Sequence, residues 1–114
     1  MTAPQAAFTV VSPGCYQLTG AIGLNAITRL ATDAAVLFRA QAQRGAGVAE
    51  VDLSGLTATT SAVLALLLEC AELARERSIR LTYHHLPAPL ARLAAMSNLL
   101  PLLPLAPAAP SQTG

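Results

Sequence analysis

Hydrophobic and polar positions alternate in some segments of the chain and recur every three to four residues in others. A period of two predicts a β-strand, and the longer period predicts an amphipathic helix. Around Val51 the period is two, because Ala49, Val51 and Leu53 would share one face and Glu50 and Asp52 the other. The predicted elements, in chain order, are strands at 8–11 and 15–20, a helix at 25–43, a strand at 48–53, a helix at 61–77, a strand at 79–84 and a helix at 87–96.

Turn and cap signals separate these segments. The Pro13-Gly14 pair predicts a tight turn, so the first two strands should form a hairpin. Asn25 is a candidate N-cap for the first long helix, and Gly45 belongs to a glycine stop at its end. Residues 99–105 are apolar but broken by prolines, so we expect them to pack as an irregular segment.

The predicted order of elements is β-β-α-β-α-β-α. Alternation of strands with helices of these lengths predicts an α/β fold with right-handed crossovers. With 114 residues the chain has the size of one domain. We expect a single domain over residues 1–104, with an ordered core at about 8–104. A flexible tail should follow at 105–114, because that end is rich in Pro, Ala and Ser.

Composition then narrows the class of protein. Hydrophobic residues make up 54% and charged residues 11% of the chain, which is apolar for a soluble domain. The apolar run at residues 62–68 is far shorter than the roughly 20 residues that a membrane-spanning helix needs. No secretory signal is visible, so we expect a cytoplasmic protein without membrane insertion. The apolar excess suggests that a partner protein covers part of the surface.

Candidate chemical groups are few. All seven basic residues are arginine and form no stripe with aromatic residues, so nucleic-acid binding is not expected. Cys15 and Cys70 have no metal-like spacing and should be reduced. His84 and His85 would point to opposite faces of a strand, and Asp52 lacks a recognisable catalytic partner. We therefore expect no metal, no cofactor and no enzyme activity.

Hydroxyl residues gather just before the second long helix. Thr59 and Thr60 end the loop, and Ser61 stands where the helix begins, among backbone N–H groups that lack helical partners. One interpretation is that Thr60 or Ser61 simply caps the helix. The other is a functional site. A phosphate on Ser61 would be favoured by the helix dipole, yet it would disrupt a surface that fits a neutral hydroxyl. The two roles can coexist.

Residues 51–68 resemble the signature of the STAS family, which is named after sulphate transporters and anti-sigma factor antagonists. In that family a strand ending in Asp-Leu-Ser leads through a short loop to a hydroxyl residue that opens a Leu-rich helix. Here residues 52–54 are Asp-Leu-Ser and the hydroxyl falls on Ser61. Two positions depart from the pattern: Thr60 replaces the family's Asp before the hydroxyl, and Val63 replaces a Gly two residues after it.

The resemblance covers roughly residues 8–104. It implies the STAS fold, a small mixed sheet of four or five strands with helices packed mainly on one face. The Leu-Pro ending at residues 98–104 is similar to that of MlaB-like members, the small cytoplasmic STAS subunits of intermembrane phospholipid transporters. The resemblance to these members implies that the chain is a non-catalytic subunit that binds the ATPase of an ABC complex. It would stabilise or regulate that complex and associate peripherally with the inner membrane through it.

The resemblance also implies where the partner binds and what the alternative is. The alternative is an anti-sigma factor antagonist whose Ser61 is phosphorylated by an anti-sigma factor kinase. The missing Asp at position 60 weakens that hypothesis more than it weakens plain docking. Whether the chain forms a homodimer stays open. We expect the start of the helix and its loop to make the contact, through Thr59, Thr60, Ser61, Val63 and Leu64.

Overall fold

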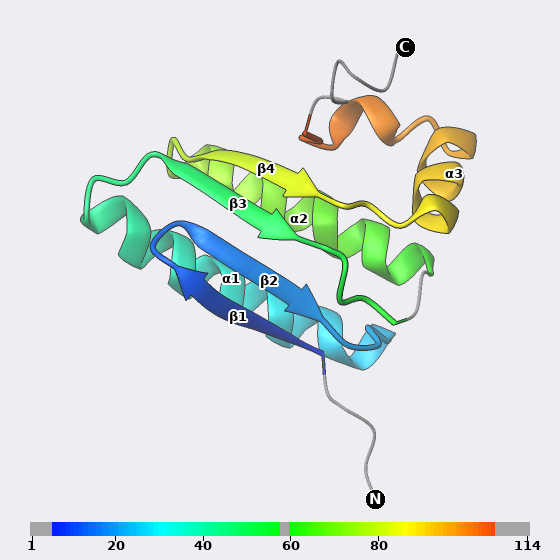
Figure 1. The fold of residues 1–114 in the computed structure, drawn as a ribbon, viewed down its shortest axis with the longest axis horizontal. Coiled ribbons are helices and arrows are strands. Elements are labelled where there is room, and N and C mark those ends of the chain that lie inside the picture. The colour runs from blue at the N-terminus through cyan, green and yellow to red at the C-terminus, as the bar shows by residue number, and fades with distance from the viewer. Residues whose placement is uncertain (1–5, 58–59, 107–114) are drawn as a thin grey trace, which may run out of the picture.

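The computed structural model describes residues 6–57 and 60–106, which form a sheet with two long helices behind it (Figure 1). The observed order of elements is β-β-α-β-α-β-α with a short 3₁₀ turn at the end. The predicted α/β class and element order are therefore confirmed. The elements are β1 (Ala7–Ser12), β2 (Cys15–Thr19), α1 (Leu24–Gln43), β3 (Val48–Asp52), α2 (Ser61–Glu76), β4 (Arg80–His84), α3 (Ala88–Met96) and η1 (Leu100–Leu102).

The strands lie in the order β1-β2-β3-β4. β1 and β2 pair antiparallel as the predicted hairpin, whereas β2–β3 and β3–β4 pair parallel because a long helix connects each pair. Gly14 in the hairpin turn has a φ of 79°, and a Cβ there would lie 2.9 Å from the backbone oxygen of Val48. The turn therefore requires glycine, both for its left-handed backbone and for the close approach of β3.

Both long helices, α1 and α2, cover the same face of the sheet (Figure 1). Alternation along the strands explains this arrangement. The inward residues Leu18, Val51 and Tyr83 are buried, and they belong to one core with helix residues such as Phe38 and Leu67. The prediction of helices mainly on one face is confirmed, and the polar sides of the central strands lie on the other face.

Helix α1 begins one residue earlier than expected. Its N-cap is Gly23, whose carbonyl accepts the backbone N–H of Ala26 at 3.0 Å. The predicted capping role of Asn25 is wrong, because Asn25 lies inside the first turn and makes no capping hydrogen bond. At the other end Gly45 has a φ of 75°, which gives the expected glycine stop.

Buried Gln41 joins the end of α1 to the sheet. Its amide nitrogen donates to the backbone carbonyls of Ala46 at 3.1 Å and Val48 at 2.7 Å. Its side-chain oxygen accepts the hydroxyl of Tyr16 at 2.5 Å. Because a buried amide is stable only when it is hydrogen-bonded, this set of bonds fixes the start of β3, the strand that leads to the candidate site.

The ordered part of the chain extends further at both ends than the sequence predicted. Leu105 forms a parallel bridge with Tyr83 on the outer edge of β4, and the N–H of Ala106 donates to the carbonyl of Tyr83 at 2.9 Å. The predicted flexible tail is therefore wrong for these two residues, since their backbone groups have partners in the sheet; residues 107–114 lie outside the described part. Ala6, expected to be loose, is buried.

Candidate partner-binding site

The loop after β3 carries the chain to the start of α2. The carboxylate of Asp52 accepts the backbone N–H of Ser54 at 2.9 Å and its hydroxyl at 3.1 Å, which turns the chain as soon as the strand ends. The N–H of Leu53 donates to the carbonyl of His84, and Leu56 forms a bridge with Gly20. The loop is thus attached to both neighbouring strands before it reaches α2.

Thr60 occupies the N-cap position of α2, and Ser61 is the first helical residue. Thr60 has an extended backbone and its carbonyl accepts the N–H of Val63 at 3.0 Å, but no side chain of the described residues caps the helix. The predicted N-cap is therefore right in position, while its hydroxyl makes no capping bond. Both side chains are exposed, and no acidic residue lies in the first turn. The electropositive helix end carries two hydroxyls available to a partner.

The five predicted contact residues divide into surface and core. Thr60 and Ser61 lie on the surface. Val63 is fully buried and Leu64 is 3% exposed, because the apolar period of α2 turns these positions toward the sheet. The expected contact surface is therefore corrected: Val63 and Leu64 support it from beneath and do not present their side chains. Thr59 lies outside the described residues.

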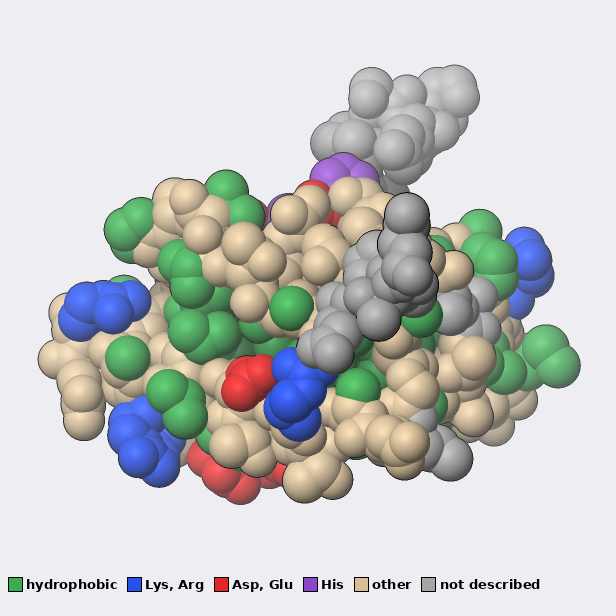
Figure 2. Space-filling view, turned by 90° about the horizontal axis from the view of Figure 1, so that it is seen from below, with side chains coloured by type: hydrophobic (Ala, Val, Ile, Leu, Met, Phe, Trp, Pro, Cys, Tyr) green, Lys and Arg blue, Asp and Glu red, His purple; other side chains and the backbone are tan. Residues whose placement is uncertain are grey.

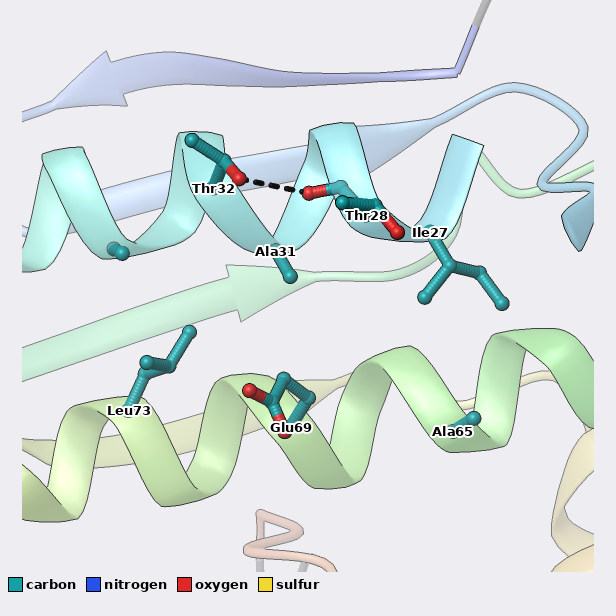
Figure 3. Close-up of a pocket in the computed structure, with 8 residues that line it drawn as sticks. Ile27, Thr28, Ala31, Thr32, Ala65, Glu69 and Leu73 are labelled. Atoms are coloured by element: carbon teal, nitrogen blue, oxygen red, sulfur yellow. Dashed lines mark hydrogen bonds between the residues drawn. The ribbon is translucent and has the colours of Figure 1, made fainter. Parts of the chain in front are cut away.

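A groove between α1 and α2 begins one helical turn beyond Ser61. It has a volume of about 510 Å³ and lies on the side of the helices that faces away from the sheet (Figure 3). The helical period of α1 does not reveal this groove, because Ala31 and Ala35 fall at the spacing of its apolar stripe. The available signal was the small size of these residues. The groove is lined by Ile27, Thr28, Ala31, Thr32, Ala35, Ala65, Glu69 and Leu73.

The uncovered face of the sheet carries two imidazole–carboxylate pairs. His85 Nδ1 lies 2.9 Å from Asp52 Oδ1. His84 Nε2 lies 2.7 Å from Glu50 Oε1, but the angles at this second contact are not those of a hydrogen bond. The backbone N–H of Ser54 and the His85 imidazole hold the pKa of Asp52 below its usual value. The expectation that the histidines point to opposite faces is wrong. Asp52 was expected to have a structural role at the strand end without a histidine beside it; its bonds to Ser54 agree with that role, but His85 does lie beside it. His85 follows the strand with a φ of 61°, which turns it back toward Asp52.

This polar cluster borders a groove of about 350 Å³ that also includes Cys15 and Gln17. Among the described residues, no three His, Cys, Asp or Glu side chains are arranged to hold a metal ion. Cys15 and Cys70 are both free; Cys70 is buried, whereas Cys15, which was also expected to be buried, is half-buried. Burial raises the pKa of Cys70 to about 12, so its thiol stays protonated at neutral pH and is not a nucleophile.

The outer surface on the β1 side mixes hydrophobic side chains with a few separated charged groups. No continuous basic stripe crosses this face (Figure 2). In the part of the chain that the structure describes, no helix combines the length and the apolar character needed to cross a bilayer. The start of α2 combines exposed hydroxyls, an open helix end and an adjacent groove.

Comparison with known proteins places the fold. The chain is similar to the anti-sigma factor antagonist SpoIIAA in its unphosphorylated form, with a TM-score of 0.66 and 12% identity over 96% of this chain and 92% of that one. It is also similar to the Bacillus cell fate determinant SpoIIAA in its phosphorylated form, with a TM-score of 0.63 and 12% identity over 96% of both chains. No curated protein sequence matches the chain.

A family model assigns the sequence more closely. The model described as "Mlab, STAS domain" matches residues 14–104, which include β2, α1, β3, α2, β4 and α3. The observed mixed sheet with its helices is the STAS fold of SpoIIAA. STAS domains are typically non-catalytic regulatory domains that interact with partner proteins. The chain belongs to the STAS family and resembles MlaB within it.

Proposed function

We propose that this chain is a non-catalytic subunit that binds the ATPase of a phospholipid-transporting ABC complex and stabilises or regulates that complex. Its role would be in intermembrane lipid transport and outer-membrane lipid asymmetry. The subunit would be cytoplasmic and would associate with the inner membrane through the ATPase. The observation that carries this proposal is the match of residues 14–104 to the MlaB-type STAS model.

The start of α2 supports a docking role on physical grounds. Thr60 and Ser61 are exposed, and no side chain within residues 6–57 and 60–106 caps the first N–H groups of the helix. A partner that supplies carbonyl or carboxylate oxygens can satisfy these donors, and it gains from the helix dipole. Buried Val63 and Leu64 tie this turn to the core, so the surface is held in a fixed shape before the partner arrives.

The proposal is tested by measuring binding between the purified chain and the purified ATPase. Wild-type protein should bind, while Thr60→Arg and Ser61→Glu should each weaken binding by about tenfold or more, since they add bulk or charge at the contact. Ser12→Glu is the matched control. Ser12 is exposed at the end of β1, and the β1–β2 turn lies at the opposite end of the sheet from the start of α2 (Figure 1). Failure of the wild type to bind the ATPase would refute the proposal. Light scattering on the same samples decides whether the subunit is a homodimer.

A second candidate is an anti-sigma factor antagonist that is switched by phosphorylation of Ser61. The observation in its favour is the exposed Ser61 hydroxyl at a helix N-terminus, in a fold shared with SpoIIAA. A phosphate there would add charge to a surface that fits a neutral group. Incubation with an anti-sigma factor kinase and ATP should then add the mass of one phosphate to the wild type and none to Ser61→Ala. An unchanged wild-type mass would exclude this candidate.

A further inference from the structure

The groove between α1 and α2 has the dimensions of a helix-binding surface. Its α1 wall extends from Ile27 to Ala35 and its α2 wall from Ala65 to Leu73. Each wall spans eight residue steps, or about 12 Å at the helical rise, which is the length of about two helical turns. Figure 3 shows Ile27 and Leu73 pointing across the gap between the two helices.

The floor and walls of the groove are suited to a closely packed helix. Ala31, Ala35 and Ala65 are small, so they leave room for a third helix to approach the axes of α1 and α2. Ile27 and Leu73 are half-buried and offer apolar contact at opposite ends. An amphipathic helix docks into such a groove through its apolar face.

Glu69 gives the groove a negative charge. Of the described residues that line the groove, Glu69 alone is charged, and it is exposed. The ion pairs of the described residues do not include Glu69. Arg29 on α1 is engaged on the β1 side, where it lies 3.5 Å from Asp33 and donates to the carbonyl of Ala6 at 2.7 Å. A carboxylate in an otherwise uncharged groove is complemented by a cation on the occupant.

The groove is continuous with the surface at the start of α2. Ser61, Ala65 and Glu69 are spaced four residues apart, so they follow one line along the helix. All three are exposed. A partner that contacts the Ser61 turn can therefore reach Glu69 within about 12 Å, which is eight residues at the helical rise.

We infer that the α1–α2 groove binds a short amphipathic helix of the partner ATPase, with an Arg or Lys of that helix paired to Glu69. This inference rests on the proposed function and adds the chemistry of the partner. The ATPase is favoured over a second copy of this chain because the groove adjoins the Thr60–Ser61 surface assigned to the ATPase.

The inference is tested by charge reversal in the same ATPase-binding assay. Glu69→Arg should weaken binding by about tenfold or more, because it places two cations opposite each other. Glu76→Arg is the matched control, since Glu76 is exposed on the same helix, lies outside the groove and undergoes the same change of charge. Surface Arg and Lys residues on the ATPase helices are then changed to Glu one at a time. One of these variants should restore the binding of Glu69→Arg, a result that general misfolding cannot produce.

A filling variant supplies a second, independent readout. Ala65→Phe should block the groove and weaken ATPase binding, whereas Ala95→Phe on the exposed side of α3 should leave it unchanged. Wild-type affinity for both Glu69→Arg and Ala65→Phe, with binding still lost in Thr60→Arg, would overturn the groove inference and leave the proposed function intact. If wild-type protein fails to bind the ATPase, the proposed function fails first. Loss of self-association alone in the groove variants would assign the groove to a second copy and overturn the inference.

Discussion

The hydroxyl of Tyr83 on β4 donates a hydrogen bond of 2.6 Å to the backbone carbonyl of Leu67 in α2. Both residues are almost completely buried. Burial raises the pKa of Tyr83 well above its usual value, so the phenol stays a donor across the physiological range. The bond ties the helix that begins at Ser61 to the strand on which it packs.

Removal of this bond should lower stability without reshaping the core. Tyr83→Phe keeps the ring and deletes the hydroxyl, so we expect the free energy of unfolding to fall by about 1 kcal/mol. Urea denaturation followed by circular dichroism measures the difference. A stability equal to that of the wild type would mean that the bond contributes nothing net.

Gln41 should be more sensitive, because three partners depend on it. Gln41→Met preserves volume but leaves the Tyr16 hydroxyl and the carbonyls of Ala46 and Val48 without their bonds. Each unsatisfied buried group costs about 1–3 kcal/mol, so a loss of more than about 2 kcal/mol is expected. Gln43→Met is the control, since Gln43 is exposed on the same helix. Equal urea midpoints for the two variants would contradict the role assigned to Gln41.

Replacement by alanine should affect stability differently at Gly14, in the hairpin turn, and at Gly47, before β3. Gly14→Ala forces a Cβ to 2.9 Å from a backbone oxygen in a left-handed conformation, and should destabilise by about 1–3 kcal/mol. Gly47→Ala meets no atom within 4 Å. It should leave stability nearly unchanged or raise it slightly, because the unfolded chain loses freedom. Thermal unfolding of both variants checks the contrast, and a tolerated Gly14→Ala would disprove it.

Asp52 should make stability depend on acid pH. Its folded pKa lies below the ordinary value of 3.8, chiefly through the backbone N–H of Ser54 and then through His85. The ionised form is therefore favoured by folding, and its contribution is complete above pH 3.8 and is lost as the pH falls through the folded pKa. The stability difference between wild type and Asp52→Asn should shrink as the pH falls below about pH 4. A difference that does not change over this range would show that the carboxylate is unimportant.

Much of the fold follows from short-range pattern. The alternation around Val51 predicted which strand side is buried, and the leucine periodicity of α2 predicted a helix that starts at Ser61. Those signals depend on residues near each other in the chain. The sequence also predicted where the candidate site lies, because the start of a helix is determined by residues close to each other in the chain.

The features that sequence reasoning missed depend on partners far along the chain. His85 reaches Asp52, 33 residues away, through one left-handed residue after β4. Leu105 pairs with the sheet through backbone bonds, although the proline-rich sequence around it does not predict a strand. The groove depends on which sides of α1 and α2 face each other. None of these relationships has a period in the sequence.

The pairing of residues 104–106 with Tyr83 has a consequence for the tendency of the sheet to aggregate. An unpaired edge strand is a template on which another chain can add a strand. The C-terminal segment covers part of that template on β4. At the opposite edge, β1 carries no charged side chain, but the irregularity in its pairing between Val10 and Ser12 interrupts the ladder. A protein shortened to end at Leu103 should therefore form aggregates faster than the full chain, as light scattering over time would record.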